Sequence, residues 1–301
     1  MEIKKTAFAG SWYPDNAREC KEQIEQFLTE KDGPSEGRFA GGIVPHAGWF
    51  FSGSIACRVI ASIARSLSSV SALKPSRKID VVFVFGMHMH PGSMPCVMVN
   101  GAWQTPFGNL YVHERLAVEF AANSELAANS KVYIKKETPD SFPEENTIEL
   151  QLPFVKYFFP EAAIVPVGVP PCDVAGKMGI AAVESAKKLG LDIVVLGSTD
   201  MTHYGSNYGF APAGSGRKAL DWVKSENDPK AVSAMCSLNS SDIIFQGLKN
   251  KNLCCAGAVA AAASAAKKMG AVRGVELDYA TSYDKSPGAS FVGYSGILFS
   301  Y

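Results

Sequence analysis

The chain has 301 residues, of which 47% are hydrophobic, and it carries 29 basic and 29 acidic side chains. This balance gives no charge pattern for binding nucleic acid or anionic lipid, and the hydrophobic content suffices for a large core. The N-terminus lacks the apolar stretch of a signal peptide, and seven cysteines, an odd number without a dense spacing pattern, favour free thiols in a reducing cytoplasm. The alanine-rich stretch Ala256–Ala266 is too short to span a membrane.

Short runs rich in Val, Ile and Phe alternate with helical patterns, which predicts an α/β fold. Because the composition shows no break, we expect a single domain over residues 1–301, with a mixed, mostly parallel sheet flanked by helices. In chain order, the predicted elements are strand Gly42–Pro45, helix Ser54–Ser66, strands Asp80–Phe85 and Pro95–Val99, helices Glu114–Ala122 and Ile148–Phe158, strand Ala163–Val169, helix Val174–Leu189, strand Asp192–Leu196, helices Lys218–Ser225, Ser241–Lys249 and Gly257–Met269, and strands Gly274–Ala280 and Phe291–Phe299.

Four of the five histidines lie just past the ends of predicted strands. His46 follows the first strand, His88 and His90 follow the second, and His203 follows the strand Asp192–Leu196. Open α/β sheets bind ligands at the carboxyl ends of their strands, so these imidazoles are candidates for a shared site. Each histidine could instead cap a helix or form hydrogen bonds with the backbone of its loop, and for His113 we favour this structural interpretation.

An acidic residue stands three positions before one of these histidines. If Asp200 and His203 lie on one helical turn, they share a face, and the carboxylate orients the imidazole as a general base or a metal ligand. Asp200 alone could equally serve as a helix N-cap.

Two adjacent thiols precede the helix Gly257–Met269. A cysteine at a helix N-terminus, such as Cys254 or Cys255, has a lowered pKa and is a soft metal ligand or a nucleophile; it could also be simply a small buried residue. Glu145 and Glu149 could form an acid and base pair, but their position favours helix capping, with Asn146 as the N-cap.

Several motifs resemble those of the Memo family, also called AmmeMemoRadiSam system protein B in prokaryotes. The resemblance runs from end to end and in family order. The matching segments are Ala9–Pro14 (AGSWYP), Pro45–Gly53 (PHAGWFFSG), Val84–His90 (VFGMHMH), Glu144–Phe154 (EENTIELQLPF), Ser198–Gly205 (STDMTHYG), Leu253–Cys255 (LCC), Leu277–Ser282 (LDYATS) and Ser290–Gly296 (SFVGYSG).

The resemblance implies a fold like that of the class III extradiol dioxygenases, whose iron is held by two His and one carboxylate. In the Memo pattern a Cys replaces the carboxylate. His46 then matches the first ligand and Cys254 that Cys, while His203 and Asp200 match the active-site His and the acidic residue before it.

The segment carrying the second ligand departs from the family pattern. A gapless match places Met89 at the ligand position, with His88 and His90 on either side. We favour His90, which matches a neighbouring family His and precedes a Pro-Gly pair that can turn the chain. Asn146 is a second departure, since the family usually has His there.

The resemblance therefore implies a protein that binds iron, as Fe(II), or copper (Cu) through His46, Cys254 and either His90 or His88, and the cysteine usage places it in the cytoplasm. Its reaction would be oxidation of a small organic substrate, with His203 as acid and base. One alternative is a metal-free scaffold that binds a protein partner or peptide in the same cleft. Another is a thiol hydrolase that uses Cys254, His203 and Asp200. Neither nucleic acid nor a membrane is an expected partner.

Overall fold

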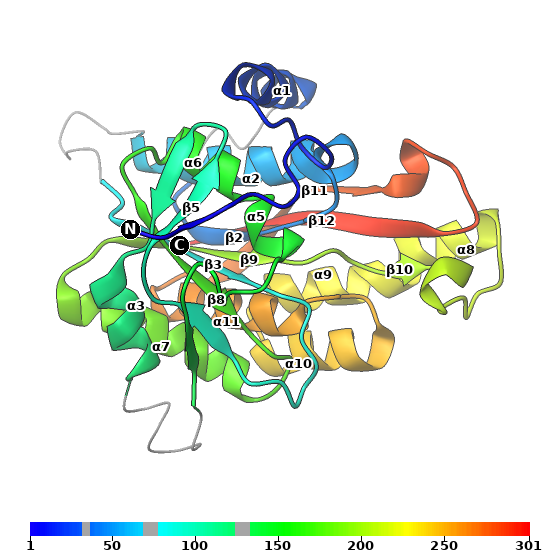
Figure 1. Ribbon diagram of the computed structural model, residues 1–301. Helices are drawn as coiled ribbons and strands as arrows, with labels where there is room; N and C mark the ends of the chain where they lie inside the picture. The colour runs from blue at the N-terminus through cyan, green and yellow to red at the C-terminus, as the bar shows by residue number, and fades with distance from the viewer. Residues whose placement is uncertain (32–36, 69–77, 124–132) are drawn as a thin grey trace.

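The structure is a computed structural model that describes residues 1–31, 37–68, 78–123 and 133–301, and its centre is a nine-stranded sheet between two layers of helices (Figure 1). The strands run in the order β10-β12-β2-β9-β3-β8-β4-β7, and β11 pairs with β12. Within this sheet the strands are β2 (Phe39–Val44), β3 (Val81–Gly86), β4 (Cys96–Met98), β7 (Lys135–Glu137), β8 (Ala163–Gly168), β9 (Ile193–Ser198), β10 (His203–Tyr204), β11 (Arg273–Thr281) and β12 (Phe291–Ser300).

The central strands β2, β9, β3 and β8 are parallel to one another, and antiparallel pairs flank them. Every residue of β3 (VVFVFG) and of β9 (IVVLGS) is buried. Such runs are stable only where helices cover both faces of a sheet. The predicted α/β class, a mixed sheet flanked by helices, is confirmed, with its parallel pairing concentrated at the centre.

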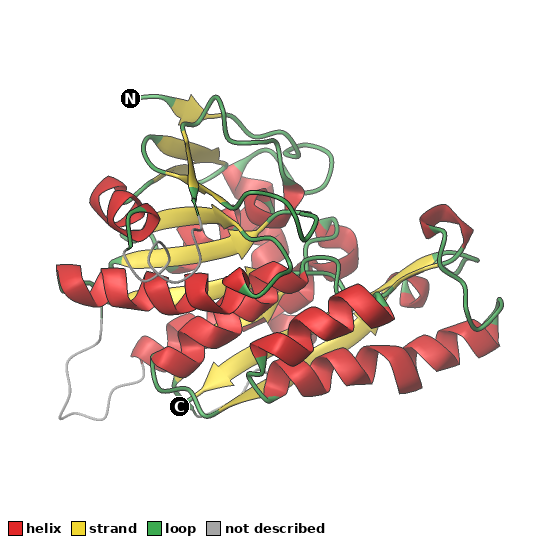
Figure 2. Cartoon of the chain, turned by 90° about the horizontal axis from the view of Figure 1, so that it is seen from below, coloured by secondary structure: helices red, strands yellow, loops and turns green. Residues whose placement is uncertain are grey.

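The helices form one layer on each side of the sheet. In Figure 1, α2 and α6 lie above it and α3, α7 and α11 below it, and Figure 2 shows the covered lower face. The α-helices are α1 (Ala17–Glu30), α2 (Ser54–Ser68), α3 (Glu114–Ala121), α5 (Asn146–Glu149), α6 (Leu152–Phe158), α7 (Val174–Leu189), α8 (Arg217–Trp222), α9 (Asp228–Cys236), α10 (Ser240–Phe245) and α11 (Ala256–Lys268); π-helical turns at Trp49–Gly53, Val223–Asn227 and Gln246–Asn250 adjoin α2, α8 and α10.

The small residues of α11 let it approach its neighbours closely. A Cβ added to Gly179 of α7 would lie 2.0 Å from the carbonyl oxygen of Ala261, and one added to Gly197 of β9 would lie 2.9 Å from the Cβ of Ala262. Larger side chains would push α11 away from both elements. This packing fixes the start of α11, where the two adjacent cysteines lie.

The N-terminal segment is tied to the rest of the fold by one buried carboxylate. Glu149 accepts hydrogen bonds from the backbone N–H groups of Ala7 and Phe8 and, at 3.0 Å, from the hydroxyl of Tyr13. Tyr13 is buried, whereas Trp12 stays 41% exposed. The predicted capping role of Glu149 is therefore wrong, because its side chain turns away from the helix toward this segment.

Several short elements were not predicted. A three-stranded sheet joins β1 (Ile3–Lys4), β5 (Ala102–Thr105) and β6 (Gly108–Tyr111), and α9 separates α8 from α10. The predicted helix Ile148–Phe158 is divided into α5 and α6, and Pro153 stands in the first turn of α6.

One helix of the described residues, Trp49–Leu67, is apolar and long enough to cross a membrane by length and composition, with a mean hydropathy of 1.2. However, 67% of that stretch is buried inside the protein, where α2 packs against β2 and β12. Its apolar composition is that of a core helix.

Candidate metal centre

A cavity of about 640 Å³ opens at the carboxyl ends of the parallel strands. His46 follows β2, His88 follows β3 and Asp200 follows β9, so three neighbouring strands each deliver a polar side chain to one edge of the sheet. Residues of β12 and the loop before it form the opposite wall, and aromatic side chains form the rim. Other lining residues include Trp12, Phe50, His203, Tyr208 and Tyr294.

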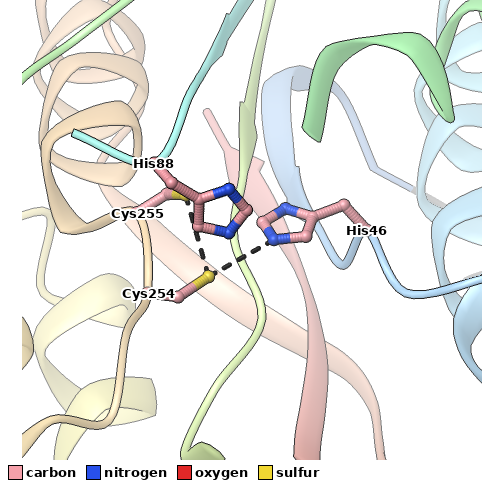
Figure 3. Close-up of side chains that lie close together, drawn as sticks. All are labelled: His46, His88, Cys254 and Cys255. Atoms are coloured by element: carbon pink, nitrogen blue, oxygen red, sulfur yellow. Dashed lines mark hydrogen bonds between the residues drawn. The ribbon is translucent and has the colours of Figure 1, made fainter. Parts of the chain in front are cut away.

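At one side of this cavity, four potential metal ligands come together (Figure 3). Each of His46, His88, Cys254 and Cys255 offers one donor atom, and these atoms all lie within 4.8 Å of one another. The two imidazoles, from the loops after β2 and β3, face the two sulfur atoms, which belong to the segment just before α11. The ring centroids of His46 and His88 are 5.0 Å apart, in an edge-to-face arrangement.

His46 is held so that one ring nitrogen faces the thiols. Its Nδ1 lies 3.0 Å from Ser198 Oγ, and its Nε2 lies 3.3 Å from Cys254 Sγ. Its backbone N–H donates to Asp200 Oδ1 at 2.8 Å, and its carbonyl accepts from Asn146 Nδ2. Burial by itself lowers the pKa of His46, but the negative charges of Asp200 and Cys254 outweigh it and raise the pKa above its ordinary value.

His88 reaches the cluster because the chain turns just before it. Met87 has φ 75°, and its N–H donates to Thr147 Oγ1 while its sulfur lies against Cys96. The side chain of His88 then faces Cys254 on one side, and its Nδ1 lies 3.1 Å from Glu145 Oε1 on the other. Although burial opposes the shift, these two partners raise the pKa of His88 to about 10.

The two thiols differ in their surroundings. Burial alone raises the pKa of Cys254, but a hydrogen bond from Cys255 and the nearby charge of His46 bring it well below its ordinary value. The N–H of Asp200 also donates to Cys254 Sγ, at 3.3 Å. For Cys255, burial and the adjacent Cys254 raise the pKa well above its ordinary value. Of the two thiols, Cys254 is therefore the one whose surroundings favour ionisation.

Asp200 lies close enough to His203 for an electrostatic interaction, and both residues line the same cavity. The segment between β9 and β10 is not helical, and among the described residues Asp200 has no hydrogen bond to His203. Its Oδ2 instead lies 4.0 Å from Nε2 of His46. The ring of His203 lies edge-to-face against Tyr208, at 4.9 Å between centroids, on the wall of the cavity.

His90 does not join the donor cluster, contrary to the preference drawn from the motif. It is exposed, and its backbone N–H donates to Ser93 Oγ. Met89 is partly buried and packs against the hydrophobic core. The reason is the turn at Met87, which brings a single imidazole of this segment, that of His88, into the cluster.

Two neighbouring polar residues of the site, Glu145 and Asn146, have roles that differ from those predicted from the sequence. Glu145, not Asn146, is the N-cap of α5, and the same carboxylate contacts His88. Asn146 lines the cavity and holds the carbonyl of His46. The acidic pair Glu144–Glu145 before a short helix marks a cap, but it carries no signal for an imidazole partner 57 positions earlier in the chain.

The fold and this cluster define an α/β protein with an imidazole-lined cavity at the carboxyl ends of parallel strands, beside two buried sulfur atoms. The family model for Memo-like proteins matches residues 4–298. MEMO1 family proteins of Pyrococcus furiosus and Methanopyrus kandleri are each 31% identical to the chain, and the alignment covers 98% of both partners in each case. One of Thermococcus kodakarensis is 30% identical over 99% of both. The chain belongs to the Memo family.

Among solved structures, an uncharacterized protein of Escherichia coli K12 aligns with a TM-score of 0.44 and 10% identity, over 80% of this chain and 92% of that one.

Proposed function

We propose that this Memo-family protein binds a metal ion, iron or copper, through His46, His88 and Cys254, and oxidises a small organic molecule held in the adjoining cavity. The observation that carries the proposal is the orientation of the two imidazoles. In both rings Nδ1 is engaged by a neighbouring oxygen, from Ser198 or Glu145, while the other side of the ring faces Cys254. Metal-binding histidines characteristically have their second nitrogen held in this way.

The donor set fits such an ion. Metal–nitrogen and metal–sulfur bonds in proteins are about 2.0–2.3 Å, so donors of one ion lie within roughly 4.6 Å of each other. In a four-coordinate centre the donors are closer still, roughly 3.3–3.8 Å apart, so this cluster, whose donors lie within 4.8 Å of one another, would contract by up to about 1 Å on binding. The lowered pKa of Cys254 favours its thiolate form, and the N–H of Asp200 donates to its sulfur. When bound, the ion would supply redox chemistry next to the cavity.

The protein's other residues would bind the substrate and move protons. Trp12 and Phe50 at the rim provide apolar surface. His203 stands on the wall with a ring able to accept or donate a proton toward the cavity, and it is the residue we propose as acid and base. All seven cysteines are free thiols, which supports a cytoplasmic setting.

The decisive measurement is the metal content of protein purified under anaerobic conditions, compared with His46→Ala and with His113→Ala as the matched control. His113 caps α3 far from the cluster. We expect iron or copper at close to one ion per chain in the wild type and the control, and a loss of most of it in His46→Ala. If the wild-type protein is metal-free and cannot be loaded with either ion, the proposal is overturned. That result would favour the alternative of a metal-free scaffold that binds a protein or peptide.

One contact favours a second candidate, a thiol-dependent hydrolase. Cys254 Sγ lies 3.3 Å from His46 Nε2, the spacing of a nucleophile and its base, and Asp200 lies beside that imidazole. His46 would then replace His203 as the base. Rapid alkylation of Cys254 by iodoacetamide at neutral pH in metal-free protein, with a stable fold, would support this candidate over the first.

A further inference from the structure

Cys255 has no role in the ligand set that the Memo pattern implies, yet its sulfur lies within the same cluster. Its Sγ is 3.7 Å from Cys254 Sγ, and its donor atom lies within 4.8 Å of those of His46 and His88. The residue is 2% exposed, so its thiol faces the interior rather than solvent. Figure 3 shows the two sulfur atoms side by side, facing the two rings.

The position of this sulfur is fixed by regular structure. Cys255 is the N-cap residue of α11, and its backbone N–H donates to Thr199 Oγ1 at 3.1 Å. Thr199 follows β9 directly, and the alanines of α11 pack against that strand. A side chain held between a strand end and a close-packed helix has little freedom to move away from its neighbours.

We propose that Cys255 is a fourth ligand of the metal, which makes the centre a closed set of two thiolates and two imidazoles. The inference rests on the metal centre proposed above. On binding, the Cys255 thiol would lose its proton to solvent and its sulfur would bond to the ion. Two thiolates with two imidazoles suit a thiophilic ion, zinc or copper(I), better than iron(II).

A closed set has a direct chemical consequence. Structural metal sites in proteins use four protein donors, whereas catalytic sites keep one position open. With Cys255 bound, a molecule in the cavity reaches the ion only in exchange for one of the four donors. Cys255 thus determines whether the metal serves as a structural link between α11 and the loops after β2 and β3, or as a reaction centre.

The test uses Co(II) as a spectroscopic probe added to anaerobic, metal-free protein. Wild type should show sulfur-to-cobalt charge-transfer bands of two thiolates and the intense visible bands of a four-coordinate ion. Cys255→Ala should keep one thiolate, with charge-transfer absorbance reduced to about half, weaker visible bands, and a Co(II) affinity lower by more than the roughly 10- to 100-fold that loss of an outer-shell partner costs. Cys172→Ala, a thiol outside the cluster, is the matched control and should resemble wild type.

Each outcome separates the two proposals. If wild type and Cys255→Ala give the same one-thiolate spectrum and the same affinity, the fourth-ligand inference is overturned while the metal centre stands. If wild-type protein binds no Co(II) and neither iron nor copper, both fail. Because alanine already fills most of α11, Cys255→Ala is compatible with the helix; Cys255→Ser, which should also lose half of the charge-transfer absorbance, guards against a fold defect.

Discussion

Nδ1 of His88 lies 3.1 Å from Oε1 of Glu145, although 57 residues separate the two in the chain. The same carboxylate accepts the backbone N–H of Thr147 and so caps α5, whose position is set by the fold. The side chain of His88 is 45% exposed, which gives it freedom to leave the cluster unless a partner holds it. Glu145 is that partner.

Glu145→Gln should therefore weaken metal binding without disturbing the fold. An amide cannot supply the charge that orients the imidazole and raises its basicity, and loss of such a partner typically lowers metal affinity by about 10- to 100-fold. Competition with a chromophoric chelator measures the change. Glu144→Gln alters the adjacent exposed carboxylate and should have the affinity of wild type; equal affinities in all three proteins would exclude the role of Glu145.

His88→Ala and His90→Ala should differ although the two histidines are only two residues apart. His88 belongs to the donor cluster, whereas His90 is exposed outside it. We expect His88→Ala to lose most of its bound iron or copper after anaerobic dialysis, and His90→Ala to keep the wild-type amount. Metal analysis of both variants checks this. A loss confined to His90→Ala would show that the loop after β3 adopts another register in the metal-bound protein.

The placement of His46 could be predicted from the sequence, because a buried strand ends just before it and parallel strands share one carboxyl edge. The choice between His88 and His90 could not. It depends on the single positive φ of Met87, and that turn depends on tertiary packing. Gly168 leaves no room for a Cβ, which would lie 2.3 Å from the sulfur of Met87.

The contact of Asp200 with His46 also could not be predicted from the sequence. Asp200 stands three positions before His203, and a helical turn would have placed the two side chains on one face. Instead the N–H of Met201 bonds to Gly293 of β12, and the chain enters β10 in an extended form. Long-range pairing with β12 thus overrides the local spacing, and Asp200 turns to His46. In the same way, Glu149 bonds to Ala7 and Phe8, more than 140 residues earlier in the chain.

Glu149→Gln should loosen the N-terminal segment. An amide keeps the shape of the side chain but presents an N–H group where one carboxylate oxygen now accepts hydrogen bonds from Ala7. We expect the free energy of unfolding to fall by about 2 kcal/mol, the usual cost of an unsatisfied buried donor. Chemical denaturation gives this value, and limited proteolysis should show faster cleavage before Asn16. Glu161→Gln, at an exposed site, should behave as wild type in both assays.

The contribution of Asp228 to the free energy of unfolding should decrease as the pH rises from about 4 to 7. The residue is fully buried, and its carboxyl accepts from the N–H and hydroxyl of Thr202 and from the hydroxyl of Tyr279. Burial raises its pKa to about 6, against roughly 3.9 for an unfolded chain. The folded protein therefore binds the proton more tightly, so this contribution is complete below the unfolded pKa and is lost as the pH passes through the folded pKa.

The variant Asp228→Asn removes this titration while it keeps the shape of the side chain. Between pH 4.5 and pH 7, the free energy of unfolding of wild type should fall by about 2 kcal/mol relative to the variant. Urea denaturation at the two pH values measures the difference, and Asp140→Asn, at an exposed carboxylate, should follow the wild-type curve. Parallel curves for wild type and Asp228→Asn would mean that Asp228 stays ionised in the folded protein, with its charge stabilised by Thr202 and Tyr279.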